Sequence, residues 1–111
     1  IIASGGELIS TVELEHAVLR DDRVAEVAVV GVPDERWGNR PLVLVRLKAG
    51  ATATARSLWD GLDGRVEPWK RPDHWAFVDN IPQTTVGKFD KIRIRARHAA
   101  GEYQVTTIAP R

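Results

Sequence analysis

Two apolar segments dominate the first half of the chain and constrain its fold more than any other feature. Residues 24–32 are apolar except for Glu26 and Gly31, and residues 41–47 consist mainly of leucine and valine. Runs of this length and composition are typical of strands that are buried on both faces of a sheet. The residues between them, 33–39, form a polar connection, and we therefore predict that the two strands pair with each other.

The segment before these strands predicts a hairpin and a helix. A glycine pair within residues 1–9 favours two short extended pieces joined by a tight turn. Ser10 and Glu13 have the spacing of a capping box, so we expect a helix that begins at Ser10 and ends near Asp21. The apolar face of this helix consists of Leu14, Ala17 and Val18.

The second half of the chain predicts two further helices and one strand. Thr52 or Thr54 caps a helix that runs to about Leu62, and residues 74–78 form a third strand. Asp90 caps a last helix over residues 91–100, although the alternation in residues 92–95 also suits a strand.

These elements together indicate a small domain of the α+β or α/β class. It has a three-stranded sheet flanked by helices, plus a short N-terminal β-hairpin. The tail after Gly101 is expected to be loosely held.

Composition excludes several classes of function. The 111 residues fit one domain, and the absence of cysteine excludes disulfides, thiolate metal sites and thiol nucleophiles. A net charge of +1 gives no general field for nucleic acid. No apolar run approaches the length of a membrane span, so we expect no membrane-spanning segment. Because the chain enters directly at Ile1 into an apolar, glycine-rich segment, we expect it to be a fragment of a longer protein.

Lys88 lies in the most distinctive polar stretch, residues 82–91. Gly87 permits a tight turn immediately before the lysine, and Pro82 stiffens the entry to the loop. A lysine held in this way is a mobile positive charge that suits phosphate or carboxylate oxygens. Local composition alone, however, favours a solvated surface lysine, and the spacing does not match a nucleotide-binding P-loop.

A second distinctive stretch is Ser4-Gly5-Gly6-Glu7. Its glycines can line a narrow passage or present backbone N–H groups to an anion, but a plain β-turn is the simpler interpretation. The alternating basic residues between 91 and 97 are interpreted as a solvated helix face. The three histidines have no metal-binding spacing, and no metal ligands are predicted. The four tryptophans are interpreted as core or domain-contact residues.

Three motifs in order carry a resemblance that none of them carries alone. The first is residues 4–10 with Glu13-Leu14-Glu15, the second is residues 29–38, and the third is residues 82–91. In this order and spacing they resemble the C-terminal domain of the adenylate-forming superfamily, which includes acyl-CoA synthetases. The resemblance extends from Ile2 to about Ala100 and is strongest to fatty-acyl-CoA synthetases.

The resemblance implies a reaction in two steps, carried out by a cytoplasmic AMP-forming ligase. A fatty acid and ATP, with Mg²⁺, first form an acyl-adenylate and pyrophosphate, and coenzyme A then attacks the adenylate to give a thioester and AMP. These substrates are expected to bind mainly to a large N-terminal domain, the partner that residues 1–111 lack. Residues 1–111 would be the mobile C-terminal domain that covers it, and would be inactive in isolation.

The resemblance also implies roles for particular residues. Lys88 matches the lysine that reaches the acyl carboxylate and the α-phosphate of ATP during adenylation. Gly5, Gly6 and Glu7 match the loop that leaves room for the pantetheine arm of coenzyme A in the second step.

The chain departs from the family at three points. The family's hinge residue would precede Ile1, Ala3 stands where many relatives carry lysine, and Gln83 replaces a usual lysine or arginine. Two alternatives therefore remain: an adenylating enzyme with another acid or acceptor, such as a fatty-acyl-AMP ligase, or a non-catalytic interaction module. The presence of Lys88 argues against the second.

Overall fold

The computed structural model describes residues 1–108, in which two sheets and three α-helices form. The elements, in chain order, are β1 Ile2–Ser4, β2 Glu7–Ile9, α1 Thr11–Leu19, β3 Val24–Asp34, β4 Gly38–Leu47, α2 Ala55–Asp60, a 3-10 turn Pro68–Lys70, β5 His74–Phe77, α3 Lys91–Ala99 and β6 Thr106–Thr107. The α+β class and the N-terminal hairpin predicted from the sequence are confirmed.

The main sheet is mixed and has four strands in the order β3-β4-β5-β6. The two apolar runs pair antiparallel, as predicted, from Val24 opposite Leu47 to Asp34 opposite Gly38. Strand β5 is parallel to β4, and β6 is antiparallel to β5. Strands β1 and β2 form a separate antiparallel pair.

The connection between β3 and β4 is shorter than the sequence indicates. Most of residues 33–39 belong to the two strands, and only residues 35–37 form the turn. The Asp34 carboxylate closes this turn by accepting the N–H groups of Arg36 and Trp37, each at 2.9 Å. The hairpin therefore extends into a polar segment. Its end is stabilised by hydrogen bonds from a local side chain, and no apolar pattern in the sequence marks it.

Residues 102–108, the described part of the tail after Gly101, are also more ordered than predicted. Thr106 and Thr107 pair with β5 and add the fourth strand of the sheet. Ile108 is buried, and its backbone N–H donates to the Asp73 carbonyl at 2.7 Å. Tyr103 and Val105 also pack against the core on the α3 side. These scattered apolar residues form no regular pattern, so the sequence does not reveal the strand.

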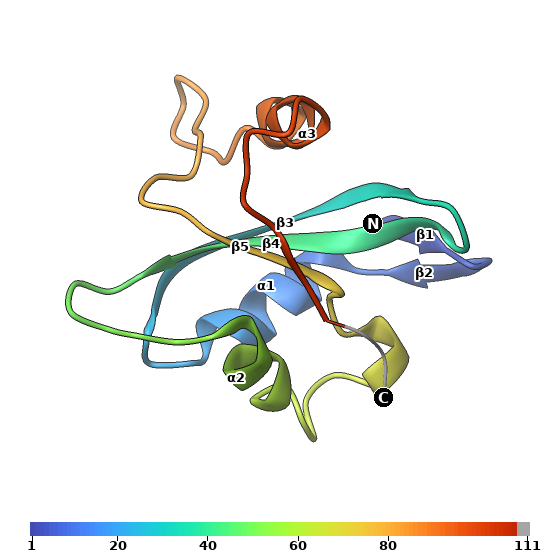
Figure 1. Cartoon of the computed structure of the whole chain (residues 1–111), viewed down its shortest axis with the longest axis horizontal. Coiled ribbons are helices and arrows are strands. Elements are labelled where there is room, and N and C mark those ends of the chain that lie inside the picture. Colours follow the sequence, from blue (N-terminus) through green and yellow to red (C-terminus); the bar gives the residue numbers. More distant parts are fainter. Residues whose placement is uncertain (109–111) are drawn as a thin grey trace.

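Alternate residues of the central strands face two separate cores. Val27, Val29 and Val43 pack with α1 and α2 on one face, whereas Ala28 and Val30 pack with Ile94 of α3 on the other. Figure 1 shows α1 and α2 below the sheet and α3 above it. Burial on both faces is the reason that these strands are almost continuously apolar.

The helix starts follow the predicted capping residues. Ser10 accepts the backbone N–H of Glu13, and Asp90 accepts that of Arg93. Thr54, rather than Thr52, caps α2 with a reciprocal capping box to Ser57. The helix predicted over residues 91–100 is confirmed as α3. Within residues 1–108, no helix has the length and apolarity that crossing a membrane requires.

Candidate functional site

The loop that carries Lys88 is a small closed hairpin. The Thr84 N–H donates to the Lys88 carbonyl at 2.7 Å, and the Asp90 N–H donates to the Pro82 carbonyl at 2.8 Å. Gly87 has a φ of 82°, which allows the tight return of the chain. Ile81 and Phe89 pack against the core on the α3 side of the sheet. The loop therefore has a fixed shape, and its base is attached to that core.

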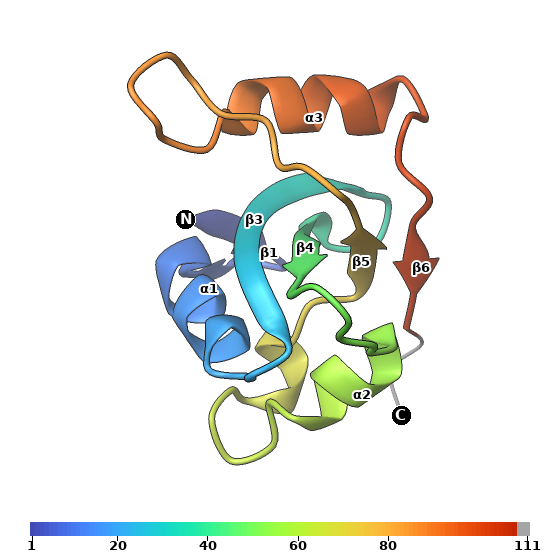
Figure 2. The same ribbon diagram turned by 90° about the vertical axis from the view of Figure 1, so that its left-hand side faces the viewer.

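The Lys88 side chain is exposed on this loop. Within residues 1–108 it makes no salt bridge and no side-chain hydrogen bond. Figure 2 shows that the loop before α3 projects beyond the sheet. The ammonium group of Lys88 is thus available to an anion supplied from outside this domain.

The glycine pair forms the tip of the β1–β2 hairpin, where the two glycines are constrained differently. Gly5 and Gly6 have φ values of 57° and 83°. The Gly5 N–H donates to the Trp37 carbonyl at 2.8 Å, and a Cβ atom at Gly5 would lie 2.7 Å from the Trp37 ring. A Cβ atom at Gly6 would meet nothing within 4 Å. Packing therefore requires glycine at position 5, whereas only the backbone conformation favours it at position 6.

A partly open cavity of about 520 Å³ adjoins the glycine hairpin. Its walls combine Ser4, Gly5 and Glu7 with the indole rings of Trp37, Trp59 and Trp69. Trp37 and Trp69 are exposed, whereas Trp75 is fully buried in the core and its indole N–H donates to the Pro72 carbonyl. Three of the four tryptophans thus line one surface cavity, a grouping that the sequence does not predict.

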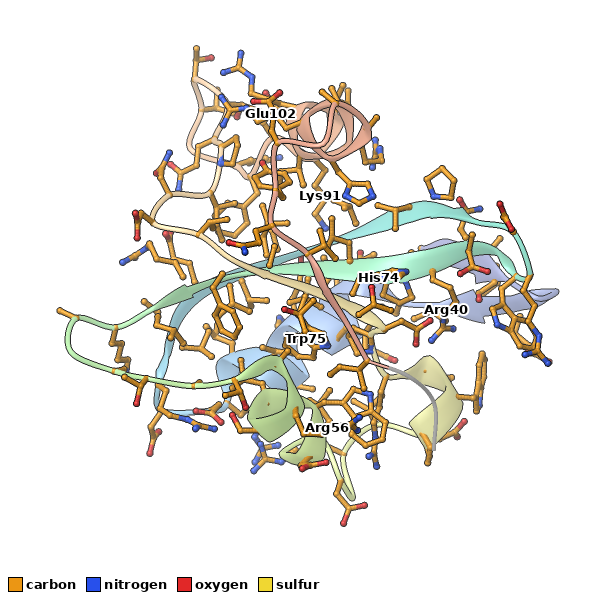
Figure 3. The ribbon with its side chains drawn as sticks, in the orientation of Figure 1. Arg40, Arg56, His74, Trp75, Lys91 and Glu102 are labelled. Atoms are coloured by element: carbon orange, nitrogen blue, oxygen red, sulfur yellow. The ribbon has the colours of Figure 1, made fainter. Side chains whose placement is uncertain are left out.

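Arg40 holds the base of this cavity together. It is 5% exposed and donates to both carboxylate oxygens of Asp73, at 2.7 and 3.1 Å. Its other bonds reach the Ser4 hydroxyl at 3.2 Å and the Arg71 carbonyl at 3.0 Å. Arg40 therefore connects β1, β4 and the start of β5 (Figure 3). The only sequence signal for it is an arginine just before an apolar strand.

One group of potential metal ligands is present among residues 1–108. Asp34, Asp73 and His74 each offer one atom, all within 4.8 Å of one another. Arg40, however, donates to both oxygens of Asp73, and Asp34 caps the β3–β4 turn. Burial lowers the pKa of His74, although the carboxylates of Asp73 and Asp34 favour its protonated form. We interpret the group as structural, consisting of the Arg40–Asp73 salt bridge beside a turn-capping aspartate and a histidine that contacts the Thr107 hydroxyl.

The structure separates the two predicted sites. The glycine hairpin lies beside the β3–β4 turn, and the Lys88 loop projects from the α3 side of the sheet, at the other end of the molecule (Figure 1). The two loops cannot act on one bound substrate without a large reorientation of the domain.

The basic residues after Lys88 are not all solvated. Arg93 and Arg95 are exposed, as predicted for a solvated helix face. Lys91, by contrast, is partly buried and forms a salt bridge to Glu15 of α1 at 3.0 Å.

Comparison with known proteins identifies the class to which this fold belongs. Residues 13–88, more than half of the chain, match the family of AMP-binding enzyme C-terminal domains. The chain belongs to this family. Lys88 is the last residue of the match, and the glycine pair at residues 5 and 6 precedes the matched range.

Curated relatives carry the names of several CoA ligases. The chain is 39% identical over 95 residues to a 3-methylmercaptopropionyl-CoA ligase of Ruegeria lacuscaerulensis, covering 86% of this chain and 18% of the relative. It is 38% identical over 99 residues to a long-chain-fatty-acid–CoA ligase of Thermus thermophilus, covering 88% of this chain and 18% of the relative. The chain thus spans less than a fifth of the length of these relatives.

Solved structures share the fold. MatB from Rhodopseudomonas palustris superposes with a TM-score of 0.85 at 31% identity, covering 91% of this chain and 20% of that one. The amide bond synthetase McbA from Marinactinospora thermotolerans superposes with a TM-score of 0.82 at 29% identity, covering 86% and 19%. The names of these similar proteins differ in both the acid and the acceptor.

Proposed function

We propose that residues 1–111 are the mobile C-terminal domain of an AMP-forming fatty-acyl-CoA synthetase. The full protein would join a fatty acid to coenzyme A through an acyl-adenylate, with ATP and Mg²⁺ bound mainly by its N-terminal domain. One observation carries the proposal: a free lysine and a glycine hairpin project at separate ends of one domain. Each could serve one of two successive steps if the domain rotates between them.

Lys88 is assigned to the adenylation step. When a carboxylate approaches the α-phosphate of ATP, two negatively charged groups are brought together, and a nearby ammonium group offsets this repulsion. The exposure of Lys88 and the closed shape of its loop support this role, because the charge can reach another domain without being neutralised by its own.

Gly5, Gly6 and Glu7 are assigned to the coenzyme A step. The open space at Gly6 leaves room for the narrow pantetheine arm, whereas the Trp37 ring covers Gly5. The adjoining cavity has indole rings of Trp37 and Trp69 on its walls, which suit a flat heteroaromatic group such as the adenine of coenzyme A. The hairpin would thus provide a passage for the pantetheine arm, and the adjoining cavity a binding site for the adenine, on the same side of the domain.

The identities of the acid, a fatty acid, and of the acceptor, coenzyme A, are the most specific parts of the proposal. They are supported by the resemblance of the sequence motifs to fatty-acyl-CoA synthetases and by the long-chain ligase among the relatives. We also propose a cytoplasmic location, which fits a sequence without cysteine.

The test is an assay of the full-length enzyme with ATP, coenzyme A and a series of carboxylic acids. We expect AMP and acyl-CoA to form in equal amounts, fastest with medium- or long-chain acids. Adenylate formation without a thioester would instead indicate an acyl-AMP ligase or a synthetase with another acceptor. No adenylate with any acid would support the non-catalytic module.

A further inference from the structure

Glu15 lies at the outer edge of the sheet and has two partners. It projects from α1, and its Oε2 atom accepts the backbone N–H of Val29 at 2.8 Å. Strand β3 is the last strand of the sheet on this side, so the outward N–H of Val29 has no neighbouring strand to receive it. The Glu15 carboxylate therefore satisfies a backbone donor that would otherwise be left unpaired at a partly buried edge.

Lys91 is the second partner of the same oxygen atom. Its Nζ lies 3.0 Å from Glu15 Oε2 and 3.5 Å from the Thr11 hydroxyl. The side chains of Lys91 and Glu15 are 31% and 17% exposed, so this pair is less screened by water than a surface pair. Figure 3 places Lys91 between α3 and the sheet.

The pair joins the two layers of the domain. Helix α1 packs on one face of the sheet and α3 on the other. Glu15 and Lys91 meet at the edge strand β3, so their contact runs around the edge of the sheet. It is the only one of the salt bridges found among residues 1–108 that connects α1 to α3.

The position of Lys91 is unfavourable for the helix itself. It is the first residue of α3, where the helix dipole favours acidic side chains and disfavours a lysine. Asp90 already supplies the cap by accepting the N–H of Arg93. The lysine therefore does not serve to start the helix, and its interaction with Glu15 supplies a reason for a positive charge at this point.

We propose that Glu15 and Lys91 are positioning residues that fix the direction of Lys88. The inference rests on the proposed function, because it assumes that Lys88 acts in adenylation. Lys91 follows Lys88 by three residues and stands at the base of the closed 82–90 hairpin. Because the hairpin is held by its own backbone bonds, a shift of its base would move Lys88 as part of one rigid loop.

The test uses the full-length ligase and measures the two half-reactions separately. Glu15→Gln keeps an oxygen acceptor for Val29 but removes the charge that attracts Lys91, and Lys91→Met removes the ammonium group. We expect each to lower the rate of ATP–pyrophosphate exchange by up to about a hundredfold, because a catalytic group displaced by about 1 Å can lose that much rate. Thioester formation from added acyl-adenylate should stay unchanged. Lys91→Arg should retain activity, and the double variant should be no slower than the slower single variant.

The matched control is Glu26→Gln, which breaks the Glu26–Arg46 pair between β3 and β4. This pair has a similar length and involves the same edge strand, and its loss should change neither half-reaction. Equal slowing of both half-reactions by Glu15→Gln, or no slowing of exchange, would overturn the positioning role. If Lys88→Ala stops exchange while Glu15→Gln and Lys91→Met do not, only this inference fails. If Lys88→Ala leaves exchange intact, the proposed function fails as well.

Discussion

Lys88 combines a hydrogen-bonded backbone with an exposed, unpaired side chain in the described part of the chain. Its carbonyl group accepts the Thr84 N–H, whereas its ammonium group has no partner within residues 1–108. Holding the backbone reduces the entropy that is lost when the side chain meets an anion. This is the arrangement expected of a charge that acts on a substrate brought by another domain.

Replacing Lys88 with alanine in the full-length enzyme should slow adenylation by about 10²–10³-fold. The variant lacks a preorganised positive charge of the kind that contributes ~2–4 kcal/mol in a transition state. ATP–pyrophosphate exchange measures this step, and thioester formation from added acyl-adenylate should be largely spared. Lys48→Ala, at another exposed lysine, is the matched control and should change neither step. Equal loss of both half-reactions would contradict the assignment.

The two glycines of the hairpin predict different results. Gly6→Trp points a bulky ring into open space at the hairpin tip, so it should block the coenzyme A step on the order of a hundredfold by obstructing the path. Adenylation should continue. Gly50→Trp is the matched control, since Gly50 has a similar φ of 76° and equally open surroundings. An enzyme with Gly6→Trp that is slow only in adenylation would show that the passage lies elsewhere.

At the scale of the element, α3 shows how packing decides whether an ambiguous sequence forms a helix or a strand. The alternation of Ile92 and Ile94 with arginines suits a strand, yet the segment is helical. Asp90 caps the helix, and only Ile94 is buried, while Ile92 is 76% exposed. A helix can bury Ile94 in the second core and leave its neighbours in water. A strand would place both isoleucines on one face.

This difference gives a stability prediction for α3. Ile94→Ala should lower the free energy of unfolding of residues 1–111 by ~2–5 kcal/mol, because it leaves a cavity in the core under α3. Ile92→Ala removes the same atoms from an exposed position and should change stability by less than about 0.5 kcal/mol. Urea denaturation measures both. Similar losses in the two variants would mean that α3 does not pack as described.

At the scale of the whole molecule, the domain consists of two cores separated by one sheet. Arg40 crosslinks three segments on one side of the molecule, and Glu15 with Lys91 connects the layers at the edge of the sheet. Polar groups make both of these links. Because their partners are far apart in the sequence, local patterns do not reveal them.

The polar network around Arg40 predicts a pH dependence of stability. Burial lowers the pKa of His74 in the folded chain, against a value of about 6.5 in the unfolded chain. The unfolded chain therefore binds a proton more readily, and stability should fall as the pH drops below about 6.5. Urea midpoints of residues 1–111 at about pH 7.5 and 5.5 measure the effect. His74→Gln should weaken the dependence and His16→Gln, on the exposed face of α1, should preserve it.

The sequence by itself determined the strand pair, the first two helices and the family, and it predicted the third helix with its cap at Asp90. These features depend on residues close in the chain: apolar runs, the cap at Asp90, and the glycines that permit tight turns. The motifs around Gly5 and Lys88 are local in the same sense, which is why both loops were found without a structure, although their roles stay predictions.

Only the tertiary structure decided which groups meet across long separations. The sequence missed strand β6, the short turn after Asp34, and the grouping of Trp37, Trp59 and Trp69 around one cavity. It also did not indicate that Lys91 pairs with Glu15. Such contacts depend on the crossover connection between the parallel strands β4 and β5 and on the packing of helices on opposite faces of the sheet. No local residue pattern specifies either feature.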